Sequence, residues 1–191
     1  AAVTGEQRAL AASLAVPGSV VAAISAARIY GLPLPASLEG EVLTVGPERS
    51  VRITGITAIR QSITLPTRRW WTTRIATPAA TLLLLPRYLD DDAVERCLDH
   101  CITRRLTQVR TVRALVDAVP SHAVRGRPLL MELLTARRSG IGHRSGLEQR
   151  VDRWLRNAGL RGFARNLVVD VGNGQTVEVD FGWLLARVSL E

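Results

Sequence analysis

Hydrophobic spacing near the start of the chain is helical. Thr4 and Gln7 have the spacing of a capping box, which predicts a helix over residues 5–15. Ser19 follows a Pro-Gly break and precedes an Ala/Val-rich stretch. We therefore expect Ser19 to cap a second helix that ends at Tyr30.

The pattern then changes to that of short strands. Apolar and β-branched residues predict strands over 41–45, 51–53 and 56–59, separated by turn-forming residues. Trp70 and Trp71 are adjacent, so in a strand their rings would face opposite sides. We expect one ring to lie in the core and the other at the surface.

Four further helices are predicted before residue 139. Thr77-Pro78 has the cap and first-position proline of a helix start, and Pro86 ends that helix. Asp90–Asp92 place negative charge at the start of the next helix, where the helix dipole favours it. Two more helices are expected to begin at Thr107 and Pro128.

The glycine-rich segment 139–146 is the best domain boundary in the sequence. It separates a mixed helical domain with a small β-sheet, residues 1–138, from a final segment, residues 147–191. Apolar residues at helical spacing between Leu147 and Ala158 predict a helix at the start of that segment. Strands are expected to follow it, so the fold class is α+β.

An Asn-Gly dipeptide predicts a β-hairpin in the final segment, between strands at 167–171 and 176–181. A third strand is expected near the end of the chain. Pairing the apolar faces sets Phe181 opposite Leu190 and Trp183 opposite Val188. In the alternative, the third strand is short, frayed or differently registered.

This register would place Asp180 directly opposite Glu191. Cross-strand neighbours have Cβ atoms about 5 Å apart, close enough for two carboxylates to hold one Mg²⁺ ion. Such an ion would offset the repulsion of the two acids and activate a water for phosphodiester attack. Glu148 is a third candidate acid, although its spacing from Ser145 is also that of a capping box.

The charge distribution narrows the possible partners. The net charge is +8, and all 25 basic residues are arginines. Residues 104–165 hold 14 arginines against four acids, a concentration typical of phosphate binding or of a solvated surface. In the final helix we expect Arg150, Arg153 and Arg156, with Arg144 before it, to face nucleic acid; the alternative is a solvated helix face.

Other functional classes find little support in the sequence. No apolar run reaches the length of a membrane span, and two cysteines are too few for a secreted disulfide framework, so we expect a cytoplasmic protein. Cys97, His100 and Cys101 could be metal ligands, but the spacing favours buried core thiols.

The final segment resembles a known domain. The pattern S-x-x-E, an Asn-Gly hairpin, V-D-F-x-W and then R-V-x-L-E is similar to actinobacterial proteins with a domain like very-short-patch-repair endonucleases, of the PD-(D/E)xK fold. The resemblance implies a partial restriction-endonuclease-like αβββ unit. It makes Asp180 the motif aspartate, Glu191 the acid of (D/E)xK and Glu148 the acid of the first helix, with catalysis dependent on Mg²⁺.

Two segments of the first domain resemble AbiEi-type antitoxins and regulators. They are SAARIYGLPLP at 25–35 and ATPAATLLLLP at 76–86. Where that family reads P-A-R-T-L-L-D, this chain has apolar residues at the Arg and Asp positions. The likeness implies that the chain begins after a winged helix and ends before the nuclease-like domain is complete.

Two functions are therefore expected. The first is a DNA-associated, Mg²⁺-dependent endonuclease-like protein with DNA as its partner. The alternative is a non-catalytic AbiEi-type antitoxin or transcriptional regulator that binds DNA or a cognate toxin protein. Which of them applies, and the oligomeric state, are left open by the sequence.

Overall fold

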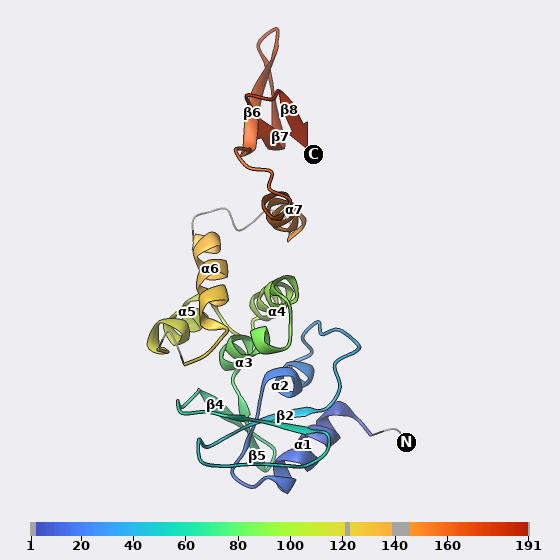
Figure 1. Ribbon diagram of the computed structural model, residues 1–191, viewed down its shortest axis with the longest axis vertical. Coiled ribbons are helices and arrows are strands. Elements are labelled where there is room, and N and C mark those ends of the chain that lie inside the picture. The colour runs from blue at the N-terminus through green and yellow to red at the C-terminus, as the bar shows by residue number, and fades with distance from the viewer. Residues whose placement is uncertain (1–2, 121–122, 139–145, 191) are drawn as a thin grey trace. The chain divides into compact units, whose positions relative to one another are not determined.

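The fold is mixed α+β and divides into two compact units, residues 1–142 and 143–191. The computed structural model describes residues 3–120, 123–138 and 146–190. Each unit contains a β-sheet of its own (Figure 1). The α+β class predicted from the sequence is thus confirmed.

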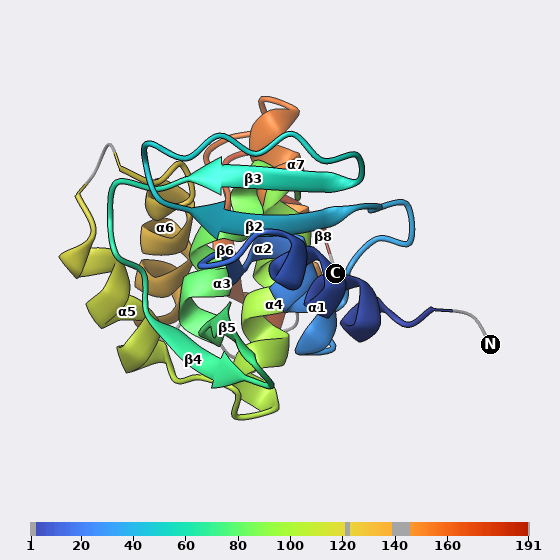
Figure 2. The ribbon, with the colours of Figure 1, turned by 90° about the horizontal axis from the view of Figure 1, so that it is seen from below.

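A five-stranded mixed sheet forms the centre of the first unit. Its strands are β1 (Val20–Val21), β2 (Glu41–Val45), β3 (Ile56–Arg60), β4 (Thr67–Trp70) and β5 (Thr73–Ala76), in the order β3-β2-β1-β5-β4. The pairs β2–β3 and β1–β5 are parallel, and the other two pairs are antiparallel. Figure 2 shows β2 and β3 side by side with the same direction.

Six helices accompany this sheet. They are α1 (Gly5–Ala15), α2 (Ala23–Ile29), α3 (Pro78–Leu84), α4 (Asp91–Thr103), α5 (Val109–Ala118) and α6 (Arg127–Arg138). Helices α3 to α6 gather on one side of the sheet (Figure 1). Their inward faces and the sheet bury a continuous aliphatic core, whose largest fully buried side chains include Leu43, Ile75, Leu82, Leu83, Leu98 and Leu130.

The predicted caps at Thr4 and Thr77 are confirmed, and Asp90, predicted only to place charge at a helix start, is also a cap. Thr4 and Gln7 form a reciprocal capping box at α1. The hydroxyl oxygen of Thr77 accepts a hydrogen bond from the backbone of α3, and the Asp90 carboxylate does the same at α4. These caps satisfy backbone N–H groups that have no partner within the helix.

The prediction that Ser19 caps a helix is wrong. The next two residues, Val20 and Val21, instead form the central strand β1, which pairs with β2 on one side and β5 on the other. Helix α2 begins only at Ala23, without a side-chain cap. The Ser19 hydroxyl is buried and has no hydrogen-bond partner among the described residues. Pairing with strands distant in sequence has therefore outweighed the local helix signal.

The strand predicted at 51–53 is also wrong, because that segment makes only an isolated bridge between Ile53 and Ile56. In contrast, the β4–β5 hairpin separates the two tryptophans. Trp70 packs partly buried against the core, while Trp71 lies in the turn with φ 51° and is 69% exposed. One ring thus contacts the core and the other is at the surface, as expected, but a turn rather than strand alternation divides them.

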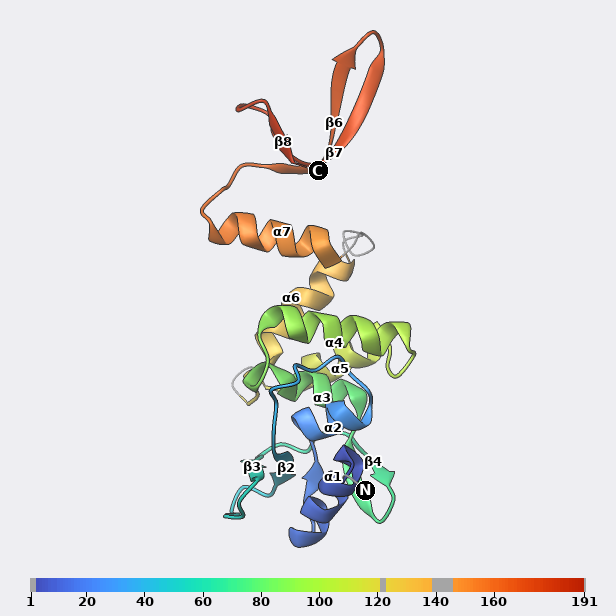
Figure 3. The ribbon, with the colours of Figure 1, turned by 90° about the vertical axis from the view of Figure 1, so that its right-hand side faces the viewer.

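The described residues of the second unit form one helix and a three-stranded antiparallel sheet. Helix α7 (Gly146–Asn157) precedes β6 (Ala164–Gly172), β7 (Gln175–Trp183) and β8 (Val188–Leu190). Asn173 and Gly174 join β6 to β7, with φ values of 54° and 71°, as a two-residue turn of type I′ requires. Figure 3 shows the resulting long hairpin. The predicted αβββ order and the Asn-Gly turn are confirmed.

None of the described helices combines the length and the apolar character needed to cross a bilayer.

Candidate functional site

The register between β7 and β8 positions the candidate metal site. Phe181 pairs with Leu190 and Trp183 pairs with Val188, as the apolar pattern predicted. Asp180 is half-buried and lies between Val179 and Phe181, which are both buried. Because side chains alternate along a strand, the Asp180 carboxylate leaves the sheet on the face opposite to these two apolar residues.

An aromatic cluster holds this end of the sheet in place. The ring of Phe163 meets the rings of Phe181 and Trp183 edge-on, with centroids 5.6 and 5.4 Å apart. The Trp183 indole N–H donates a hydrogen bond of 3.0 Å to the Arg161 carbonyl oxygen. A Cβ on Gly182 would lie 2.5 Å from Leu167, so β6 and β7 are packed closely here. The backbone that carries Asp180 is therefore well supported.

The Asp180 carboxylate is a candidate metal ligand. It makes no hydrogen bond or ion pair with any other described residue. A carboxylate with both oxygens free is a suitable ligand for a hard cation such as Mg²⁺, which prefers oxygen donors. Among the residues that the structure describes, however, no three acidic, histidine or cysteine side chains come together as a metal site.

Several predicted site residues lie outside the part of the chain that the structure describes. Glu191 and Arg144 are not among the described residues. For Glu148, Arg150 and Arg153, the backbone belongs to α7 but the side chains lie outside the described part. Their proposed roles therefore remain predictions.

Arg156 is the described member of the predicted nucleic-acid-binding row. Its Nε donates to both carboxylate oxygens of Asp152, at 3.2 and 3.1 Å, and its guanidinium lies 5.3 Å from the centre of the Phe163 ring. Asp152 is buried and also pairs with Arg165 of β6. The side chain of Arg156 is 62% exposed, so it still presents charge to solvent while it pairs with Asp152 in the same helix.

The apolar face predicted for α7 is only partly buried. Leu155 is 2% exposed, whereas Trp154 is 65% exposed. The sequence pattern placed both in one stripe, but neighbouring positions on a helix point about 100° apart, so they need not share an environment. The position of Asp152 in the buried interface was not predicted, because nothing in its local sequence marks a partner 13 residues away.

The two cysteines are core thiols, as the spacing favoured. Both are fully buried in α4. Burial raises the pKa of Cys97 to about 11 and that of Cys101 to about 12, since the thiolate would lose its hydration. Such thiols are poor nucleophiles near neutral pH.

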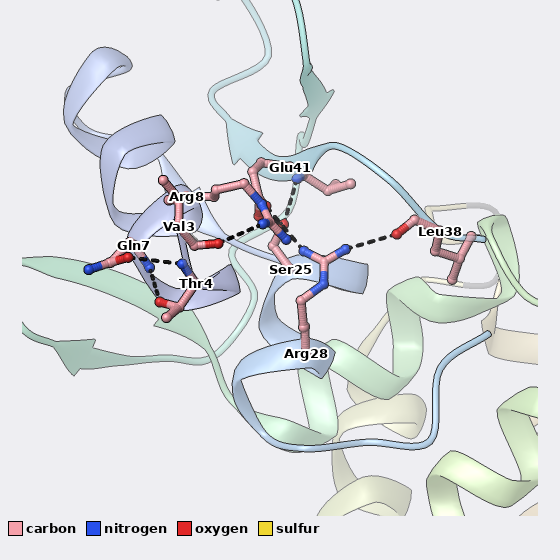
Figure 4. A network of polar contacts seen from close by, with 9 residues as sticks. Val3, Thr4, Gln7, Arg8, Ser25, Arg28, Leu38 and Glu41 are labelled. Atoms are coloured by element: carbon pink, nitrogen blue, oxygen red, sulfur yellow. Dashed lines mark hydrogen bonds and ion pairs between the residues drawn. The ribbon is translucent and has the colours of Figure 1, made fainter. Parts of the chain in front are cut away.

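A buried polar network in the first unit was missed by the sequence reasoning (Figure 4). Glu41 is 5% exposed and accepts hydrogen bonds from Arg8 of α1, at 3.3 Å, and from Arg28 of α2, at 3.1 Å. Ser25 donates a third. Arg28 also reaches the Leu38 carbonyl oxygen at 3.2 Å. Because Arg8 lies on α1, Ser25 and Arg28 lie on α2, and Glu41 lies on β2, the network joins these three elements.

The network is structural in character. Ser25 Oγ donates to Glu41 and accepts from the Val42 N–H at 2.8 Å, so its hydrogen-bonding capacity is used within the protein. Buried charges in proteins are ordinarily paired and hydrogen-bonded, as this carboxylate is. In the sequence, this network was marked only by a charged residue, Glu41, at the start of a mostly apolar strand.

Comparisons of the chain with protein-family models, with curated proteins and with solved structures find no match.

Proposed function

We propose that the protein is a DNA-binding phosphodiesterase of the metal-dependent endonuclease type, in which Asp180 and Glu191 hold Mg²⁺. The β7–β8 register carries this proposal. Pairing of Phe181 with Leu190 needs to continue by only one residue for Asp180 to face Glu191 across the two strands. The lack of a partner for the Asp180 carboxylate among the described residues supports the same assignment.

In this proposal, the residues of the chain have separate roles in binding the metal and the DNA. A bound Mg²⁺ would polarise a phosphate oxygen and lower the pKa of a bound water. Asp180 and Glu191 would bind the ion, and Glu148 would assist from α7. The arginine-rich region 104–165 would attract the phosphate backbone, and Arg156 would contribute exposed charge close to β6.

Cleavage of DNA by the full chain with and without Mg²⁺ tests the proposal. We expect nicking or cutting that depends on the metal and that Asp180→Asn lowers by about 100-fold or more. Asp170→Asn is the matched control, because it removes one charge from the adjacent strand while its amide oxygen can still accept from Gly172. Binding of Mn²⁺ followed by electron paramagnetic resonance gives a readout independent of activity. Cleavage by Asp180→Asn at the wild-type rate would overturn the site assignment.

A second candidate is a regulator that binds DNA or a toxin protein without cleaving DNA. Two observations favour it: the surplus of arginine between residues 104 and 165, and the lack of a three-ligand cluster among the described residues. This function predicts DNA binding that weakens steeply with salt, with no Mg²⁺-dependent cleavage. DNA binding that is insensitive to salt would count against the electrostatic account.

A further inference from the structure

Two adjoining pockets open on the first unit, and the residues of the candidate metal site do not line them. The larger has a volume of about 440 Å³, and the smaller one of about 120 Å³. They share the lining residues Gln61–Ile63 and Leu84, so the two pockets lie next to each other, and we call the pair the hollow. A volume of this size is within the range of small-molecule sites.

Three arginines from three separate segments line the smaller pocket. Arg60 ends β3, Arg87 lies in the 3₁₀ helix Leu85–Arg87, and Arg125 precedes α6. Among the described residues, none of the three forms an ion pair or hydrogen bond with another side chain. No Asp or Glu appears in the described lining of either pocket, and the larger pocket adds a fourth cation, Arg74.

Close backbone packing brings two of these arginines together. A Cβ on Gly126 would lie 2.2 Å from the Leu83 carbonyl oxygen and 2.8 Å from the Pro86 ring. Only glycine permits this approach, which sets Arg125 beside the segment that carries Arg87. The positive end of the α6 dipole adds to the potential here, because the helix begins at the next residue after Gly126.

All three arginines are exposed, so water screens their mutual repulsion, while their guanidinium groups remain accessible to a bound anion. Each guanidinium presents a planar fork of N–H donors, which matches the oxygens of a phosphate group. Ser62 and Gln61 add neutral hydrogen-bonding groups to the same wall. The larger pocket is lined by threonines and aliphatic residues, which suit a less charged portion of a ligand.

We propose that this hollow binds a phosphate-bearing small molecule of nucleotide size. The phosphate group lies among Arg60, Arg87 and Arg125, and the rest of the ligand occupies the larger pocket. A terminal phosphate fits a pocket of about 120 Å³ better than the continuous backbone of a duplex does. The proposal is independent of the metal site, which lies in the other unit.

Isothermal titration calorimetry on the full chain tests the site, with adenosine monophosphate, inorganic phosphate and adenosine as probes. We expect the monophosphate to bind and adenosine to show no measurable binding, because the arginines recognise the phosphate. Arg87→Gln and Arg125→Gln should each weaken binding by about tenfold or more, the loss of one charge-assisted contact. Arg110→Gln is the control, since Arg110 is exposed and does not line either pocket.

The outcomes separate the sources of phosphate. Equal binding of inorganic phosphate and the monophosphate supports the arginine site with free phosphate as its ligand, whereas tighter binding of the monophosphate supports a nucleotide. Absence of binding by either probe at about 10 mM overturns the proposal. The proposal is also overturned if Arg125→Gln binds the monophosphate as tightly as wild type does. The circular dichroism melt of this variant must match that of wild type for the comparison to count. Displacement of the monophosphate by a duplex oligonucleotide would assign the arginines to DNA instead.

Discussion

Ser25 and Glu41 are joined by a hydrogen bond of 2.5 Å, and the same Ser25 oxygen accepts the N–H of Val42. One hydroxyl thus orients a buried carboxylate and completes the hydrogen bonding of the strand that carries it. The carboxylate is held from the other side by Arg8 and Arg28. A buried ion pair contributes little beyond a hydrophobic replacement, but breaking it leaves a charge unpaired.

Removal of Glu41 should therefore destabilise the first unit strongly. We expect Glu41→Ala to lower the free energy of unfolding by about 3 kcal/mol. This value is at the lower end for a broken buried ion pair, because half of the Arg8 side chain is exposed to water. Ser25→Ala should cost about 1–2 kcal/mol through the unsatisfied Val42 N–H. Urea unfolding measures both values. The exposed Glu39→Ala is the control; equal effects of Glu39→Ala and Glu41→Ala would contradict the prediction.

The pairing of Asp152 with Arg165 should tie α7 to β6. We expect Asp152→Ala to destabilise the second unit by about 2–3 kcal/mol, because Arg165 and Arg156 both lose their buried partner. Amide hydrogen exchange in α7 should rise accordingly. Asp117→Ala, which removes an exposed pair with Arg113 one helical turn away, should change stability by less than about 0.5 kcal/mol. Unchanged exchange in the Asp152 variant would show that other contacts hold the helix.

The β6–β7 turn should depend on its two residues. Gly174 has φ 71°, a conformation that an L-residue adopts at a cost of about 1–2 kcal/mol. We expect Gly174→Ala to destabilise the second unit by about 1 kcal/mol and Asn173→Asp to have a smaller effect, since Asn and Asp both tolerate positive φ. Thermal unfolding followed by circular dichroism measures the difference. An equal loss for both variants would argue against the type I′ turn.

The buried thiols should make the protein sensitive to alkali. The pKa of Cys97 is raised to about 11 and that of Cys101 to about 12, against 9.0 for a free thiol. Since the unfolded chain loses its thiol protons first, the stabilisation is complete below pH 9 and is lost as pH rises through the folded-state values. Each thiol adds a slope of about 1.4 kcal/mol per pH unit in that window.

Replacement of both cysteines by alanine isolates their contribution. The double variant is expected to be less stable near neutral pH, because it leaves a small cavity, but to lose stability more gradually above pH 9. Burial also raises the pKa values of Tyr30 and Tyr88, so part of the alkaline slope should persist. Identical slopes for wild type and double variant would mean that the thiols titrate normally in the folded state.

Features encoded by neighbouring residues were predictable from the sequence. The Thr4 capping box and the Asn173-Gly174 turn each depend on residues within four positions of one another. The β7–β8 register agrees with the pairing of apolar faces that the sequence favoured. The sequence therefore predicted where Asp180 lies in the sheet, while the metal site itself stays a prediction.

Features that depend on distant segments were not predictable. Val20–Val21 became a central strand because β2 and β5 pair with it, although the local sequence favours a helix. Glu41 is paired with arginines 33 and 13 residues earlier, and no spacing rule connects them. The convergence of Arg60, Arg87 and Arg125 likewise arises only once Gly126 packs against α3.

The Glu41 network also bears on the order of events during synthesis. Every charged and hydroxyl partner of this carboxylate precedes it in the chain, at positions 8, 25 and 28. As the polypeptide leaves the ribosome, Glu41 therefore emerges after all the groups that neutralise it. The α1–α2–β2 corner can satisfy its buried charge without waiting for the rest of the sheet, so it is suited to form early during translation.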